Sequence, residues 1–122
     1  MTKSLVLICL FFITGFTLSA QVGCTKGNCL NGYGNYTFPG GARYIGDFKD
    51  GKMHGEGILY YVDGSKYIGN WLEQEREGKG RMTFANGDVY FGIFKASKFH
   101  GQGIMNYANG NSYDGEWRNG QP

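Results

Sequence analysis

The chain of 122 residues is long enough for one ordinary domain. Its 22 glycines break helices, while its nine phenylalanines and nine tyrosines can form a core, so the composition excludes both a helical bundle and a disordered tail. A formal net charge of +2 gives no electrostatic reason to expect nucleic acid as a partner.

Residues 1–20 have the pattern of a secretory signal peptide. One positive charge precedes an apolar run at residues 5–18, and small residues stand ahead of Gln21. We predict cleavage after Ala20, and therefore a protein that is secreted or lies in the periplasm or cell envelope. The alternative is a retained membrane anchor, but the apolar run is shorter than the roughly 20 residues that a spanning helix needs.

Residues 21–29 form an N-terminal cap segment that contains two cysteines, Cys24 and Cys29. In an oxidising compartment this spacing predicts a local disulfide that closes a small loop. A zinc site is disfavoured because four ligands are usual. Lipidation of Cys24 is the other alternative: Gly23 fits the small residue required before a lipidated cysteine, whereas Gln21 stands where an aliphatic residue is expected.

The sequence then repeats every 23 residues, from Leu30 to Gly120, without insertion or deletion. Each period contains a tyrosine, a glycine and a phenylalanine or tryptophan, spaced two residues apart. A Gly-x-Gly pair and a further aromatic residue follow. We predict that the first three of these positions form the structural core of the repeats: Tyr44, Gly46, Phe48, Tyr67, Gly69, Trp71, Tyr90, Gly92, Phe94, Tyr113, Gly115 and Trp117.

The alternation within each period predicts strands. Tyr44, Gly46 and Phe48 share one face of a strand, and more polar residues occupy the other face. Between strands, Asp63-Gly64 and its equivalents favour two-residue primed turns with positive φ. Each period is therefore predicted to be a β-hairpin. Because a lone hairpin is at best marginally stable, successive hairpins are expected to stack their aromatic faces into one core.

This pattern resembles the MORN repeat, the membrane occupation and recognition nexus motif, in which Tyr-x-Gly-x-Trp/Phe is followed by a short loop and His-Gly-x-Gly. The resemblance covers residues 30–120, with three full repeats at residues 42–110 and a half repeat at each end. It implies an all-β fold, an elongated single-layer meander of about eight antiparallel strands. The half repeats contribute strands at about residues 35–38 and at residues 112–117.

The Gly-x-Gly pairs invite a catalytic or phosphate-binding interpretation. A phosphate loop would open a helix, but each pair here leads into another aromatic strand. His54 and His100 share one repeat position, yet no serine, cysteine or carboxylate recurs beside them as a nucleophile and base would. We predict that these imidazoles bond backbone groups in a turn. We also predict no enzymatic activity, and no catalytic, cofactor-binding or metal-binding residues.

The repeats differ most along one loop edge. Glu73, Glu75 and Glu77 make the loop of one repeat acidic. The positions in register along this edge are Lys49, Leu72, Lys95 and Arg118. We interpret the edge as a solvated surface, because a surface for anionic phospholipid would be more continuously basic.

Two functional classes fit these observations. The first is a non-enzymatic exported scaffold for protein–protein interaction or self-association. Self-association is expected at the C-terminal strand, head to head or antiparallel, because an unpaired strand edge invites another chain. The second is a cell-envelope module that binds glycan through aromatic residues such as Tyr33, Tyr60 and Trp71, or that binds anionic phospholipid.

Overall fold

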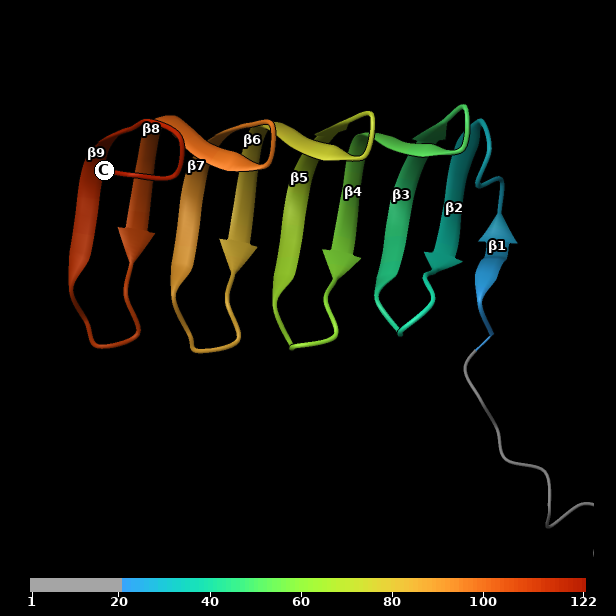
Figure 1. Cartoon of the computed structure of the whole chain (residues 1–122), viewed down its shortest axis with the longest axis horizontal. Helices are drawn as coiled ribbons and strands as arrows, with labels where there is room; N and C mark the ends of the chain where they lie inside the picture. The colour runs from blue at the N-terminus through green and yellow to red at the C-terminus, as the bar shows by residue number, and fades with distance from the viewer. Residues whose placement is uncertain (1–20) are drawn as a thin grey trace, which may run out of the picture.

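The computed structural model describes residues 21–122, so the predicted signal peptide lies outside the described residues. Nine antiparallel strands form one open sheet in chain order. Figure 1 shows them side by side in a single elongated layer, with β1 at one end and β9 at the other. The strands are β1 (Gly23–Gly27), β2 (Gly32–Thr37), β3 (Arg43–Lys49), β4 (Lys52–Tyr60), β5 (Lys66–Leu72), β6 (Glu75–Thr83), β7 (Val89–Lys95), β8 (Lys98–Asn106) and β9 (Ser112–Trp117).

The all-β meander agrees with the prediction, but the count of about eight strands was one short. The additional strand is β1, which pairs with β2 from Gly23↔Thr37 to Gly27↔Gly34. Its sequence, GCTKG, is short and has no alternation of apolar residues, so no pattern indicated a strand. Strand β2 also begins at Gly32 rather than at about Asn35. No helix within residues 21–122 is long and apolar enough to cross a membrane.

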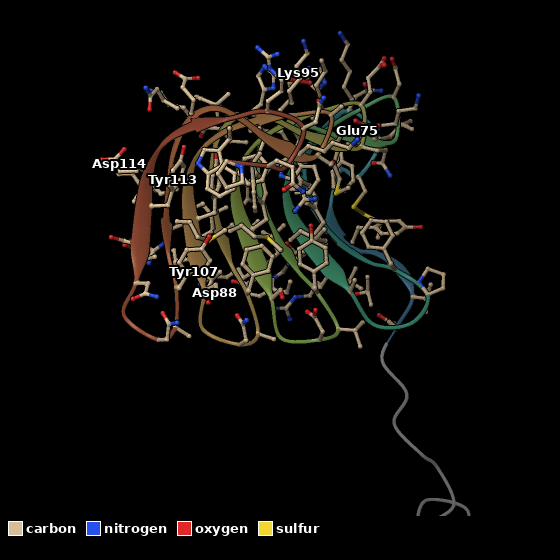
Figure 2. The ribbon with its side chains drawn as sticks, turned by 60° about the vertical axis from the view of Figure 1, so that its left-hand side comes forward. Glu75, Asp88, Lys95, Tyr107, Tyr113 and Asp114 are labelled. Atoms are coloured by element: carbon tan, nitrogen blue, oxygen red, sulfur yellow. A yellow bond between two sulfur atoms is a disulfide. The ribbon has the colours of Figure 1, made fainter. Side chains whose placement is uncertain are left out.

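The buried aromatic residues gather on one side of the sheet, which we call the inner face. Rings of successive repeats meet edge to face: the centroids of Tyr67 in β5 and Phe94 in β7 lie 4.9 Å apart at an interplanar angle of 85°. In Figure 2, Tyr113 lies within the curve of the ribbon and Asp114 points away from it. The buried hydrophobic residues are Tyr44, Phe48, Met53, Leu59, Tyr67, Trp71, Met82, Tyr90, Phe94, Met105 and Trp117.

The primed turns lie at the opposite edge from the one predicted. Asp63-Gly64 belongs to a longer loop, in which Gly64 N donates to Tyr61 O and only the glycine has positive φ. This is a type I turn followed by a left-handed glycine. Apart from Gly40-Gly41 in the loop after β2, pairs of successive residues with positive φ occur in the turns that follow the odd-numbered strands from β3 on. These turns are Asp50-Gly51, Glu73-Gln74, Ala96-Ser97 and Asn119-Gly120.

The longer strands β4, β6 and β8 bend at the first glycine of each Gly-x-Gly. In β4, Gly55 has a φ of 65°, and the register with β3 slips between Gly46↔Gly57 and Phe48↔Met53. One residue of β3 therefore faces three of β4, and such a bulge bends the strand. Figure 2 shows the ribbon curving over the inner face at the end that carries Glu75 and Lys95.

Candidate functional site

A row of glycines, one from each strand, crosses the sheet. The facing backbones lie so close that a β carbon on Gly46 would be 2.5 Å from the carbonyl oxygen of Glu56. The ring of Tyr44 covers the pair from the inner face, and a β carbon on Gly57 would overlap it. Each Gly-x-Gly is thus a bend followed by a close contact with a tyrosine ring. The row consists of Gly27, Gly34, Gly46, Gly57, Gly69, Gly80, Gly92, Gly103 and Gly115.

The tyrosines of this row are buried but hydrogen-bonded. Tyr44 Oη donates to Asp47 O at 2.9 Å and lies 3.4 Å from Glu56 O. Tyr67 and Tyr90 donate in the same way to the carbonyl three residues ahead, at 3.0 and 2.9 Å. Burial raises the pKa of Tyr44, Tyr67 and Tyr90 above the ordinary value, because a phenolate would lose its hydration on the inner face.

The raised tyrosine pKa values predict a loss of stability in alkaline solution. The unfolded chain releases its phenolic protons at about pH 10, whereas the folded chain retains those of Tyr44, Tyr67 and Tyr90. The unfolded state therefore binds fewer protons above this pH, and the free energy of unfolding falls as the pH rises. Below about pH 10 both states hold these protons, and the contribution is complete. Denaturation between about pH 8 and 11 measures the slope. If the phenolate absorbance of the folded protein rose with the same midpoint and amplitude as that of the unfolded chain, near about pH 10, this would contradict the prediction.

The predicted role of the histidines was wrong. His54 lies within β4 and His100 within β8, beside the bends rather than in turns. Neither imidazole makes a hydrogen bond within residues 21–122. The shared repeat position falls in a strand bulge, which the spacing of the Gly-x-Gly did not reveal. The described part of the chain also contains no group of three or more His, Cys, Asp or Glu residues that could hold a metal ion.

The aromatic residues considered for glycan stacking do not form one surface. Trp71 is 5% exposed, and its indole donates to Gly57 O at 3.3 Å, so it is a core residue. The Arg43 guanidinium covers the ring of Tyr60 at 4.9 Å from the centroid. Tyr33 is 65% exposed, so it is the one ring of these three that is accessible for stacking. A row of stacked sugars would need more than one such ring.

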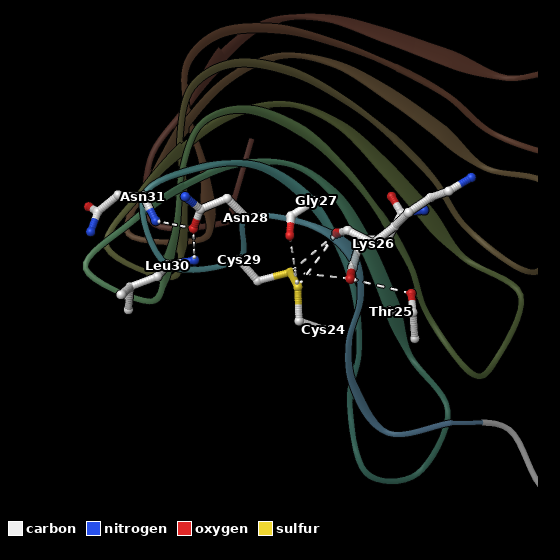
Figure 3. The surroundings of a disulfide bond; sticks show 9 residues. Cys24, Thr25, Lys26, Gly27, Asn28, Cys29, Leu30 and Asn31 are labelled. Atoms are coloured by element: carbon white, nitrogen blue, oxygen red, sulfur yellow. Dashed lines mark hydrogen bonds between the residues drawn. A yellow bond between two sulfur atoms is a disulfide. The ribbon is translucent and has the colours of Figure 1, made fainter.

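Cys24 and Cys29 are joined by a disulfide at the start of the sheet, as Figure 3 shows. A β carbon on Gly34 would lie 2.8 Å from Cys29 Sγ. The partly buried Cys29 packs against the hydrophobic core. The disulfide therefore covers Gly34 from the inner face, as a tyrosine ring covers the equivalent glycine of each later hairpin.

The register of β1 supports this equivalence. Cys24 pairs with Tyr36 in β2, and in the next hairpin Tyr44 pairs with Leu59 at the same repeat position. Gly27 pairs with Gly34 as Gly46 pairs with Gly57. Strand β1 is thus a shortened form of the tyrosine-bearing strand of a repeat. In β1, a disulfide fills the space over the glycines that a tyrosine ring fills in the later repeats.

Strand β9 bears the same inner-face residues but pairs on one side only. Tyr113 is partly exposed, whereas Tyr44, Tyr67 and Tyr90 are 0% exposed. Its hydroxyl donates to Glu116 O at 2.9 Å, and no second strand covers the ring. The three atoms nearest to a β carbon on Gly115 would all belong to Tyr113, whereas a β carbon on Gly46 would be nearest to the facing backbone. Within residues 21–122, β9 is half of a repeat core.

The turn after β9 is nevertheless formed like the others. In each repeat, the second residue of the primed turn donates its backbone N–H to the preceding hairpin. Gln74 N donates to Met53 O at 3.0 Å, and Gly120 N donates to Phe99 O at the same distance. The turn that follows β9 therefore has the conformation of the inner turns, although β9 pairs with no further strand within residues 21–122.

The repeat geometry is matched by comparison with known proteins. A sequence profile of the MORN repeat matches residues 30–43, 44–66, 67–89, 90–112 and 113–122. The chain belongs to the MORN repeat family. MORN repeats mediate protein or membrane-lipid interactions, and the family is generally non-enzymatic. No individual curated protein matches the chain.

The MORN repeats of this chain do not present a continuous basic surface at the edge of the primed turns. Lys95 and Glu75 both project from this edge in Figure 2. Lys49 pairs with Lys52 across one turn, whereas Leu72 pairs with Glu75 across the next. An acidic turn that interrupts a row of basic ones weakens attraction to an anionic membrane, which depends on clustered lysine and arginine.

Proposed function

We propose that this MORN protein is an exported, non-enzymatic scaffold that binds extended protein strands, its own copies included, at strand β9. One observation carries the proposal: Tyr113 and Gly115 of β9 pair with β8 on one side and with no strand of residues 21–122 on the other, so they present half of a repeat core. An unpaired edge offers backbone hydrogen bonds to an added strand, and side-chain pockets give such an addition its specificity.

Strand β4, which pairs with β3, indicates which sequence would fit the free edge of β9. In β4, Gly57 faces Gly46 and Leu59 faces Tyr44. A strand that completes β9 therefore needs a glycine opposite Gly115 and, two residues later, an apolar residue opposite Tyr113. The residue between them faces Asp114, so a neutral or basic side chain is favoured there.

Export is supported by two features of the sequence and structure. Residues 1–20 have the charge, apolar run and cleavage pattern of a signal peptide. The Cys24–Cys29 disulfide suits an oxidising compartment, where such bonds form and persist. We therefore place the scaffold outside the cytosol, either secreted or in the periplasm or cell envelope.

A synthetic peptide of residues 52–61, which contains the sequence of β4, tests the proposal. We expect it to shift the backbone amide resonances of Ser112–Trp117 and of the following turn in the isotope-labelled protein, with saturation. The control peptide carries Gly57→Val, whose side chain would displace the Tyr113 ring, and we expect it to bind at least about tenfold more weakly.

Three outcomes would count against this function. The first is an absence of shifts in β9 at millimolar peptide. The second is equal binding of the two peptides, which would mean that the glycine contact selects nothing. The third is a response of β9 to vesicles of anionic phospholipid but not to the peptide, which would assign the edge to a lipid.

A further inference from the structure

The N-terminal edge of the sheet carries an inference that rests on the proposed function of β9. We propose that β1 and its disulfide form an internal cap, which occupies on β2 the place that β9 of a second copy would take. While the disulfide is closed, the cap blocks head-to-tail assembly. When it is open, copies join through β9 of one chain and β2 of the next.

Strand β2 bears the residues that β9 lacks. The register of β3 on β4, transferred to β9 and β2, places Gly115 against Gly34 and Tyr113 against Tyr36. The ring of Tyr113 would then cover Gly34, where Cys29 Sγ now lies. On the other face, Asp114 would meet the neutral Asn35. The two edges are therefore complementary in shape, and their pairing opposes no like charges.

The direction of the strands explains why β1 must detach from β2 before a second copy can pair in line. The sheet has nine strands that alternate in direction, so β1 and β9 run the same way. A second copy added in line to the intact sheet would place β9 beside β1 in a parallel pair, unlike every pair in this sheet. Without β1, the exposed strand is β2, and the new pair is antiparallel.

The repeat phase also continues across this junction. Leu30 holds the repeat position of Met53, and Gln121 holds that of Lys52, which directly precedes it. Gln121 of one copy and Leu30 of the next would therefore hold consecutive positions of the 23-residue pattern, and Pro122 holds the same position as Leu30. Strand β1 does not follow the 23-residue period. Gly27 occupies the structural position of Gly46, but it lies fewer than 23 residues before it.

The cap combines a disulfide with a short, irregular strand pairing. Four of the five residues of β1 are exposed, and its pairing with β2 is broken by a register shift between Cys24 and Lys26. A dithiol reduces the bond with two electrons: the S–S bond breaks, both cysteines become thiols, and the dithiol closes to its own disulfide. Reduction removes the loop constraint that keeps this polar strand on β2.

A head-to-head pair of β9 strands fits less well. If Gly115 faced Gly115 of a second copy, each Asp114 would stand opposite a Glu116. Like charges directly opposite each other on neighbouring strands are destabilising. The head-to-tail junction has no such pair, so we assign β2 rather than β9 as the partner strand.

Analytical ultracentrifugation of the purified protein tests the cap. We expect the oxidised protein to remain monomeric, and the double variant Cys24→Ser/Cys29→Ser to rise at least about twofold in mean mass over a tenfold increase in concentration. Reduction of the unmodified protein with a dithiol should give the same rise. Adding Gly115→Val to the double variant should abolish it, since only the Tyr113 ring lies near that position within the monomer.

The outcomes separate the cap from the function of β9. A double-serine variant that stays monomeric at every concentration overturns the cap, and if the β4 peptide still binds β9, the proposed function stands. Assembly that persists with Gly115→Val overturns the choice of edges, because misfolded aggregates would not respond to this single residue. If the peptide does not bind and the variant does not assemble, both proposals are wrong.

Discussion

Replacing Gly80 with valine is expected to lower the free energy of unfolding by about 3 to 5 kcal/mol, as loss of a large core side chain does. A β carbon on Gly80 would lie 2.5 Å from Cζ of Tyr67 and nearer still to its hydroxyl oxygen. Tyr67 is 0% exposed, so its ring has no free space into which it could move. The ring must leave the core, and its packing against Trp71 and Phe94 is lost. Chemical denaturation measures the change.

The matched control for this variant is Gly115→Val in the same glycine row. Only the Tyr113 ring lies near Gly115, and Tyr113 is already partly exposed. We expect its cost to stay below about 1 kcal/mol, as for a surface substitution. Equal losses at Gly80 and Gly115 would show that valine destabilises this row for a reason other than the tyrosine contact.

Phe94→Ala should cost about 3 to 5 kcal/mol, the range for loss of a buried phenylalanine ring. Phe94 is 1% exposed and packs edge to face on Tyr67 and Tyr90, with centroids 4.9 and 5.1 Å away. The Arg76 guanidinium lies over the same ring at 5.4 Å from its centroid, so truncation also removes a cation–π contact.

His100→Ala is the control for Phe94→Ala, and thermal or chemical denaturation compares the two. His100 lies at the bulge of β8 and is only partly buried, so its removal should cost less than about 1 kcal/mol. Comparable losses for the two variants would mean that the imidazole stabilises the bend through contacts beyond those described above.

The 23-residue period made most of the sheet predictable. A side chain two residues from another on a strand must share its face, so the sequence alone assigns Tyr44, Gly46 and Phe48 to one surface. The turns were harder, because Glu73-Gln74 and Ala96-Ser97 carry no Asn-Gly or Asp-Gly signal. They adopt positive φ because two residues must connect tightly paired strand ends, and this tertiary demand overrides local preference.

The candidate site was predictable at one edge and not at the other. The trailing half repeat already indicated an unpaired strand at residues 112–117. The leading edge was expected to be a loop, since the polar residues of β1 do not alternate and Cys24 lies out of phase with Tyr44. Only the pairing of Cys24 with Tyr36 reveals that a disulfide can substitute for a tyrosine ring.

The arrangement of strands across the long axis determines how this sheet would respond to a pulling force. Contacts run chiefly between consecutive strands, and the two ends of the described chain lie at opposite ends of the layer in Figure 1. Tension applied between those ends would load the ladder hydrogen bonds one strand at a time, as in a zipper, rather than all together in shear. The layer would therefore lengthen in small steps at low force, with each hairpin opening separately from the next.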